Sequence, residues 1–183
     1  MRRSFAHAGA LSLAVVAIAA YAASAPINAS KSTIVATFTQ MSVPVDAPFR
    51  AFKGDIDYDP AHIADAKATI IVNTGSFDIG DQDYNKEVRK KAWFDSDEFP
   101  TATFTSSTIT PKGSNGFEAT GTLTIKGKAQ TITVPVSVHN QNGLLSFDGK
   151  LPLSRHYFGI GDPEWDDVVD DQVNVRFHIV RPA

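Results

Sequence analysis

The chain has 183 residues, a formal net charge of −3 at neutral pH and no cysteine. The mildly acidic balance argues against nucleic acids and anionic lipid surfaces as partners, because both attract basic proteins. The lack of cysteine excludes disulfides, thiolate catalysis, iron–sulfur clusters and zinc sites built from cysteine.

The first 22 residues have the order of a secretory signal peptide. Arg2 and Arg3 precede an apolar run, Ala8–Ala20, which is too short to span a bilayer comfortably, and small residues follow it. We expect cleavage near Ala22, within the range 22–29, and a mature domain over residues 31–183 that is periplasmic or secreted. An uncleaved anchor is the alternative.

The mature chain begins with segments that predict half-buried strands. In the range 31–41, Ile34, Ala36 and Phe38 alternate with polar residues, which is the period of a strand with one apolar face. Phe49–Asp59 and Lys67–Ile79 alternate in the same way.

Two other segments in this half have a different character. The proline-rich range 43–48 predicts a turn or a broken edge strand. Asp83–Ala92 is rich in helix formers and polar on most sides, so we expect one short surface helix there.

The aromatic segment after this helix marks a change in backbone conformation. Trp93, Phe94 and Phe99 stand beside Pro100, which disfavours helix at the residue before it. Three large aromatic side chains are too much apolar area for an exposed loop. We interpret Trp93–Phe99 as a lid folded against the end of a β-structure.

The second half of the chain consists of strands and turns. The hairpin signal at Asn140–Gly143 is typical of a primed turn. Alternating apolar residues predict further strands over 102–109, 117–125, 130–138, 145–151 and 173–181.

About eight strands with one apolar face each favour a closed antiparallel barrel, which leaves no sheet edge exposed. Inward glycines and alanines such as Gly54, Ala68, Gly121 and Gly149 would leave a lumen rather than a packed core. The sequence therefore predicts an all-β protein with an eight-stranded barrel, and a two-sheet sandwich is the alternative.

Five segments together resemble the YceI-like family of exported bacterial lipocalin-like proteins, and the resemblance runs from about Ser32 to Val180. The segments are FRAFKGDIDYDP at Phe49–Pro60, NTGSFDIG at Asn73–Gly80, KKAWFDSDEFPTATFTSS at Lys90–Ser107, GTLTIKGKAQTITVPV at Gly121–Val136 and SRHYFGIG at Ser154–Gly161.

This resemblance implies an eight-stranded lipocalin-like barrel that binds a polyisoprenoid, an isoprenoid quinone or a fatty-acyl molecule along its lumen. It implies a carrier without a cofactor other than the bound lipid. The residues that we expect to line the lumen are Phe38, Phe52, Ile56, Tyr58, Ile70, Val72, Phe77, Trp93, Phe94, Phe99, Phe104, Leu123, Ile125, Val134, Phe147, Phe158, Trp165 and Phe177. Each could equally be ordinary core.

Arg155 is the candidate for holding a ligand head group, because a guanidinium at a barrel mouth can bind a phosphate or a carbonyl. The alternative is an ion pair with Asp162, Asp166 or another acid of the following loop. The carboxylates of that loop, Asp162–Asp171, lack the spacing of a calcium loop.

The sequence contains no GxSxG elbow, HExxH motif or glycine-rich phosphate loop, so we do not expect an enzyme. The leading hypothesis is an exported lipid carrier, monomeric or homodimeric, that does not stay inserted in a membrane. A structural or stress-related interaction protein with a filled barrel core is the alternative.

Overall fold

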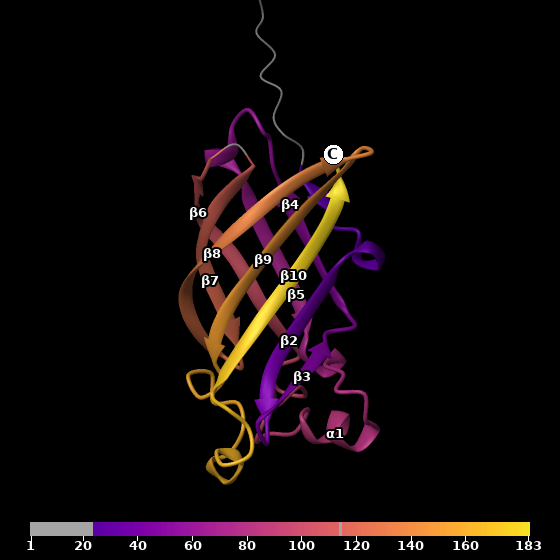
Figure 1. The fold of residues 1–183 in the computed structure, drawn as a ribbon, viewed down its shortest axis with the longest axis vertical. Coiled ribbons are helices and arrows are strands. Elements are labelled where there is room, and N and C mark those ends of the chain that lie inside the picture. The colour runs from indigo at the N-terminus through magenta and orange to yellow at the C-terminus, as the bar shows by residue number, and fades with distance from the viewer. Residues whose placement is uncertain (1–23, 114) are drawn as a thin grey trace, which may run out of the picture.

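The computed structural model describes residues 24–113 and 115–183, so the predicted signal peptide, residues 1–22, lies outside the described residues. Ten antiparallel strands form one strongly curled sheet in the order β1-β4-β5-β6-β7-β8-β9-β10-β2-β3 (Figure 1). The strands are β1 (Ala25–Pro26), β2 (Thr33–Gln40), β3 (Val43–Pro48), β4 (Phe52–Asp57), β5 (Lys67–Asn73), β6 (Thr101–Pro111), β7 (Gly116–Ile125), β8 (Lys128–Gln141), β9 (Leu144–Ser154) and β10 (Gln172–Pro182). The predicted all-β barrel-like fold is confirmed.

The strand count is higher than the predicted eight, because two short strands were not counted. β1 precedes the first predicted strand in the chain and pairs with β4. β3, predicted as a turn or a broken edge, pairs with β2 through a tight hairpin in which Met41 and Ser42 both have positive φ. Its two prolines are tolerated because β3 is an edge strand.

Main-chain hydrogen bonds outside the ladders connect the first strands of the curled sheet to its last strands. At the upper end in Figure 1, Ile27 N donates to Gly54 O (3.0 Å) and Asn28 N donates to Val180 O (2.6 Å), so the segment after β1 links β4 to β10. At the lower end, Asp78 N donates to Pro48 O (3.0 Å) and ties the chain after β5 to β3.

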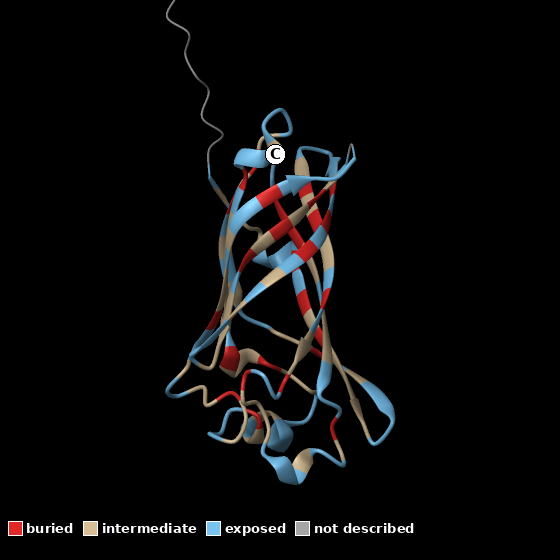
Figure 2. Ribbon diagram, turned by 90° about the vertical axis from the view of Figure 1, so that its left-hand side faces the viewer, coloured by how far each residue is buried: buried red, intermediate tan, exposed pale blue. Residues whose placement is uncertain are grey.

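In β7 and β8 the residues alternate between more buried and more exposed positions, and Figure 2 shows buried and exposed stretches changing along the strands. An upper aromatic group forms where Tyr58, Phe117 and Phe147 meet, with ring centroids 5.3–6.4 Å apart. A lower group forms around Phe77 and Phe94, whose centroids are 5.2 Å apart.

The inward glycines do not open the lumen, and this part of the prediction is wrong. A Cβ on Gly149 would come within 2.3 Å of the Phe177 ring, and one on Gly121 within 2.8 Å of the Phe104 ring. The glycines therefore seat large side chains of neighbouring strands. Lumen is left instead beside Ala68 and Ala119, which line the cavity described below.

Several predicted elements are shorter than the sequence suggested, and the strand predicted over Phe49–Asp59 is reduced to β4, Phe52–Asp57. The strand predicted over Lys67–Ile79 ends at Asn73, because a 3₁₀ turn follows at Thr74–Ser76. The helix predicted over Asp83–Ala92 is α1 (Gln82–Glu87), and hydrogen-bonded turns continue from it into the aromatic segment.

None of the helices between residues 24 and 183 that the structure describes has the length and apolar content that a bilayer crossing requires.

Candidate functional site

An internal cavity of about 280 Å³ lies inside the barrel. Its lining includes Tyr58 and Lys67 at the β4–β5 connection and Tyr84 and Trp165 in α1 and the loop after β9. These segments lie at opposite ends of the barrel in Figure 1, so the cavity follows its long axis. Almost all the lining side chains are apolar, because the inward face of each strand is apolar. Tyr84 is also half exposed, so the lining reaches the surface beside α1.

Most of the residues predicted to line the lumen do line this cavity. Those that do are Phe38, Ile56, Tyr58, Ile70, Val72, Phe77, Trp93, Phe94, Phe104, Leu123, Ile125, Val134, Phe147, Phe158, Trp165 and Phe177. Whether each of them contacts a ligand stays a prediction.

Phe52 and Phe99 are the two predicted residues that are not part of the cavity wall. Phe52 faces inward but packs against the core cluster that contains the upper aromatic group. Phe99 lies over the β7–β8 turn, where its ring would be 3.0 Å from a Cβ on Gly127. Thr74 Oγ1 donates to the Phe99 carbonyl (2.8 Å), which fixes this position.

The structure adds lining residues that the prediction omitted. Some, such as Phe117 and Ile179, belong to the alternating rows of the strands, so periodicity could have found them. Others, such as Val88, Ile160 and Val169, come from irregular segments at the lower end. No periodic signal marks them, because their direction depends on how the loops fold back.

The aromatic segment Trp93–Phe99 packs across the lower end of the barrel. Phe94 is buried and meets Phe77 and Phe49 edge-on, with ring centroids 5.2 and 5.9 Å away. Trp93 packs on Trp165, whose ring centroid lies 5.6 Å away. The segment therefore covers the cavity, as the lid hypothesis requires, and opening of this lid stays a prediction.

The β7–β8 turn holds the lid and the loop after β9 together. Lys126 Nζ donates to the carbonyls of Lys91 and Gly159, both at 2.7 Å, and burial lowers the pKa of Lys126. Gly161 N also donates to Ala92 O (2.8 Å). The two irregular segments thus form one cover over the lower end.

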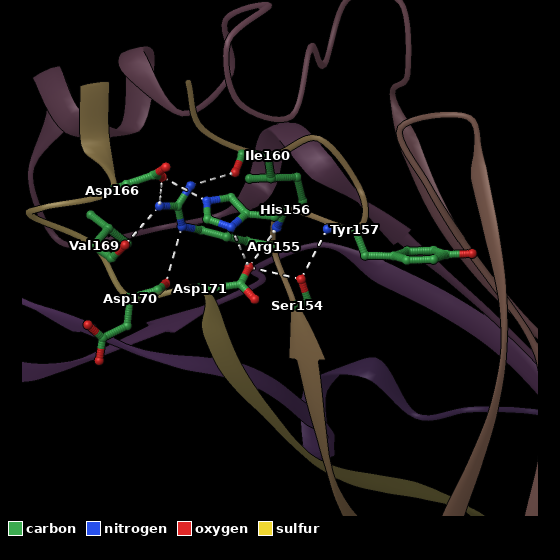
Figure 3. A network of polar contacts seen from close by, with 9 residues as sticks. All are labelled: Ser154, Arg155, His156, Tyr157, Ile160, Asp166, Val169, Asp170 and Asp171. Atoms are coloured by element: carbon green, nitrogen blue, oxygen red, sulfur yellow. Dashed lines mark hydrogen bonds and ion pairs between the residues drawn. The ribbon is translucent and has the colours of Figure 1, made fainter. Parts of the chain in front are cut away.

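Arg155 is the centre of a polar network within the loop after β9 that forms part of this cover (Figure 3). Its side chain is only 3% exposed, and Nη2 donates to Asp166 Oδ1 (2.7 Å) and to Val169 O (2.8 Å). Nη1 donates to Ile160 O (3.0 Å) and Nε to Asp170 O (3.2 Å). The structure therefore shows the ion-pair alternative, and four of the five guanidinium N–H groups are engaged within the chain.

Gly161 is required for this network. A Cβ there would lie 2.5 Å from Arg155 Nη1, and its φ of +85° disfavours any other residue. One guanidinium N–H of Arg155 remains available for the predicted contact with a ligand head group.

His156 extends the network at the surface. Its ring nitrogens lie 2.7 Å from Asp166 Oδ1 and 3.1 Å from Asp171 Oδ1. Hydrogen bonds from His156 and Arg155 lower the pKa of Asp166. Burial raises the pKa of Asp171, but hydrogen bonds from the His156 amide and the Ser154 hydroxyl outweigh it and lower the pKa. Both carboxylates are thus held ionised.

The acidic loop does not gather its carboxylates into a metal site. Within residues 24–113 and 115–183, no three side chains of the histidine, aspartate or glutamate type converge closely enough to hold a metal ion.

Comparison with known proteins gives one family. Residues 26–181 match the YceI-like domain. A UPF0312 protein of Vibrio vulnificus (strain YJ016) is 36% identical over 86 residues, which make up 47% of this chain and 46% of that protein. A UPF0312 protein of Shewanella baltica (strain OS185) is 34% identical over 91 residues, 50% of this chain and 46% of that protein. The chain spans about half the length of the curated relatives it matches.

Solved structures resemble the chain over more of its length. BcnA of Burkholderia cenocepacia is 43% identical with a TM-score of 0.82, and the match covers 84% of this chain and 98% of that one. A polyisoprenoid binding domain from Saccharophagus degradans, implicated in plant cell wall breakdown, is 15% identical with a TM-score of 0.71, covering 86% of this chain and 97% of that domain. The latter likeness shows the fold alone.

Proposed function

The chain belongs to the YceI-like domain family, and on that premise we propose that it is an exported carrier that holds the apolar chain of an amphiphilic lipid inside its barrel. The observation that carries the proposal is the long apolar cavity covered by the lid. Its volume, about 280 Å³, is near the lower limit of the roughly 300–1,000 Å³ that is usual for small-molecule sites.

The free-energy cost of leaving this cavity empty favours a ligand-binding space over a packing defect in the core. At about 24 cal/mol per Å³, a cavity of 280 Å³ would cost about 7 kcal/mol. Whole domains are stable by only about 5–15 kcal/mol. An apolar chain that entered would gain about 0.8 kcal/mol for each buried CH₂ group, which is enough for tight binding without a polar anchor.

The ligand that fits these walls is a slender isoprenoid, quinone or fatty-acyl chain. The cavity is long and lined by aromatic and branched side chains, which complement such a chain along its whole length. The polyisoprenoid binding domain of Saccharophagus degradans, which has the same fold, supports this choice. Export is proposed from the signal-peptide order of residues 1–22.

Binding is proposed in preference to catalysis because the wall offers few groups that could transfer protons. Among the described residues, no histidine or aspartate lines the cavity, and its carboxylate is that of Glu87. Arg155 reaches the wall with most of its donors already used.

The test is native mass spectrometry of the mature protein purified from a lysate that contains its native membranes, followed by identification of any released lipid. A stoichiometric adduct with an isoprenoid or acyl chain is the expected result. A protein that is empty, and stays empty when offered quinones, polyprenyl phosphates and fatty-acid amides, would favour the scaffold with a filled core.

A matched pair of variants makes the test specific for the cavity. Ala119→Trp would fill the lumen from β7, whereas Thr122→Trp places the same side chain on the outer face of the same strand. We expect Ala119→Trp to lose the adduct and Thr122→Trp to keep it. Because overpacking costs about 1–3 kcal/mol, folding is checked by circular dichroism, and Ala68→Leu on β5 repeats the block with a smaller side chain.

A further inference from the structure

The indole nitrogen of Trp93 is a buried donor that meets no acceptor among the described residues. Four buried side-chain atoms have no hydrogen-bond partner among the described residues: Trp93 Nε1, Ser96 Oγ, Arg181 Nε and the acceptor Gln130 Oε1. Trp93 is the one of these four residues that lines the cavity. A buried N–H without an acceptor is unfavourable, and Trp N–H groups usually find a partner when they are buried.

The surroundings hold this ring in one place. Trp93 packs on Trp165, and Gly161 lies so close that a Cβ there would be 3.2 Å from Trp93 Cζ3. Ala92, its chain neighbour, accepts a hydrogen bond from Gly161 N (2.8 Å). The orientation of the donor is therefore set before any ligand enters, which reduces the ordering cost of binding.

The charges at this end disfavour an anionic head group. The loop Arg155–Gln172 carries six carboxylates and one arginine. That arginine is already paired with Asp166 and three carbonyls, and Glu87, which is paired with Lys90, adds a carboxylate to the cavity wall. A phosphate or diphosphate placed here would meet the carboxylates of this loop, while Arg155 and Lys126, the cations whose hydrogen bonds hold the cover, already donate to Asp166 and to main-chain carbonyls.

We propose that the Trp93 indole N–H donates a hydrogen bond to the oxygen of an uncharged head group, such as a ketone, quinone or amide carbonyl, at the lower end of the cavity. The apolar chain then extends upward along the barrel, and Trp93 selects carbonyl lipids over phosphorylated ones. This inference rests on the proposed lipid-carrier function and adds the chemistry of the head group to it.

The experiment compares three probes whose chains each contain four isoprene units, saturated in one of them. Geranylgeranylacetone carries a neutral ketone, geranylgeranyl diphosphate carries the anionic group, and phytane supplies a branched hydrocarbon chain without a head group. Binding of each to the mature protein is measured by titration calorimetry. We expect the ketone to bind about tenfold more tightly than the hydrocarbon, the gain from one well-formed hydrogen bond, and the diphosphate to bind more weakly than the ketone.

Trp93→Phe removes the donor and keeps an aromatic ring. We expect this variant to lose the tenfold advantage of the ketone and to bind the hydrocarbon unchanged. Tyr157→Phe is the matched control, because it removes an aromatic hydrogen-bond donor from a residue that does not line the cavity and should leave the ketone preference intact.

A second readout does not depend on a variant. In the wild-type protein, the ¹⁵N–¹H indole signal of Trp93 should move downfield on addition of the ketone and stay in place with the hydrocarbon.

The outcomes separate the two proposals. Hydrocarbon binding without a ketone preference, equal or tighter binding of the diphosphate, or a preference that survives Trp93→Phe overturns the head-group assignment and leaves the carrier function standing. If none of the three probes binds, the carrier function itself is overturned, and the assignment with it.

Discussion

The two ends of the barrel are closed by different kinds of interaction. At the upper end the segment after β1 crosses between β4 and β10, and neutral hydrogen bonds fix it: Ser32 Oγ donates to Asn28 O (2.7 Å) and accepts from Val180 N (2.8 Å). At the lower end two irregular segments form the cover, and the charged network of Arg155 with Asp166 fixes it.

The difference determines which end of the barrel responds to pH. Hydrogen bonds between neutral groups do not change with pH, whereas a network that depends on ionised carboxylates loses strength when they are protonated. The lid and the loop lie at the charged end, and so does the half-exposed lining residue Tyr84. The hydrogen bonds of Ser32 at the upper end are thus independent of pH, whereas closure of the lower end depends on charge.

Replacing Arg155 with methionine should produce the largest effect. The substitution removes four hydrogen bonds from a buried guanidinium and leaves three carbonyls without their donor. Since hydrogen bonds to charged groups are worth about 1.5–3 kcal/mol each, we expect a loss of about 3 kcal/mol or more in the free energy of unfolding. Urea denaturation measures this loss.

Arg176→Met is the matched control for this prediction. Arg176 pairs with Asp46 on the outer surface, where its side chain is 51% exposed, so its loss should cost under about 1 kcal/mol. Equal costs for the two variants would show that the buried network does not hold the lower end.

Replacing Ser32 with alanine tests the upper end and should have a smaller effect. The change leaves the buried Val180 N–H without its acceptor, which costs about 1–2 kcal/mol. Ser30→Ala, two residues earlier and exposed, should change the free energy of unfolding by less than about 0.5 kcal/mol. Protection of the Val180 amide from hydrogen exchange should fall in Ser32→Ala and stay unchanged in Ser30→Ala. Unchanged protection in Ser32→Ala would count against the role of Ser32 in closing the upper end.

Much of the barrel could be predicted from the sequence, because alternation of apolar and polar residues directly reports which face of a strand is buried. This is why positions such as Ile56, Val72 and Phe147 were predicted correctly as inward-facing. The short strands β1 and β3 were not counted, because two residues or a proline-rich edge give too little periodicity to detect.

The lower end could not be predicted to the same extent, because its contacts join segments far apart in the chain. Arg155 could be recognised as important, but only the fold shows that the carbonyls of Ile160, Val169 and Asp170 surround it. The lack of an acceptor for the Trp93 indole N–H could not be predicted from the sequence either, because it depends on which acceptors the folded loops bring near. The inward glycines were misread because their space is occupied by side chains of other strands.

Arg181 provides a contrast with Arg155, because it is also buried but has no carboxylate within ion-pair distance among the described residues. It donates to Pro182 O and Tyr58 O, both at 2.8 Å, while its Nε has no partner, and burial lowers its pKa. Replacing such a charge with a hydrophobic residue removes a desolvation penalty. We therefore expect Arg181→Met to cost less than about 1 kcal/mol by urea denaturation, and a loss as large as that of Arg155→Met would contradict the contrast.

Acid should open the lower end before it affects the hydrogen bonds of Ser32 at the upper end. This is the most local of the expected effects. The pKa of Asp166 is lowered in the folded protein from 3.8, first by the hydrogen bond from His156 and then by that from Arg155. The stabilisation from Asp166 is therefore fully present above pH 3.8 and is lost as the pH falls through the lowered value.

Both tryptophans of the chain lie at this end, so their fluorescence reports on it directly. As the pH falls below 3.8, we expect the emission to shift to longer wavelength while the far-ultraviolet circular dichroism of the strands and the protection of the Val180 amide are retained. Asp166→Asn, which cannot titrate, should show a smaller acid-dependent shift. If emission, dichroism and Val180 protection change together, the two ends unfold as one unit, and the closure of the lower end is not separately controlled by charge.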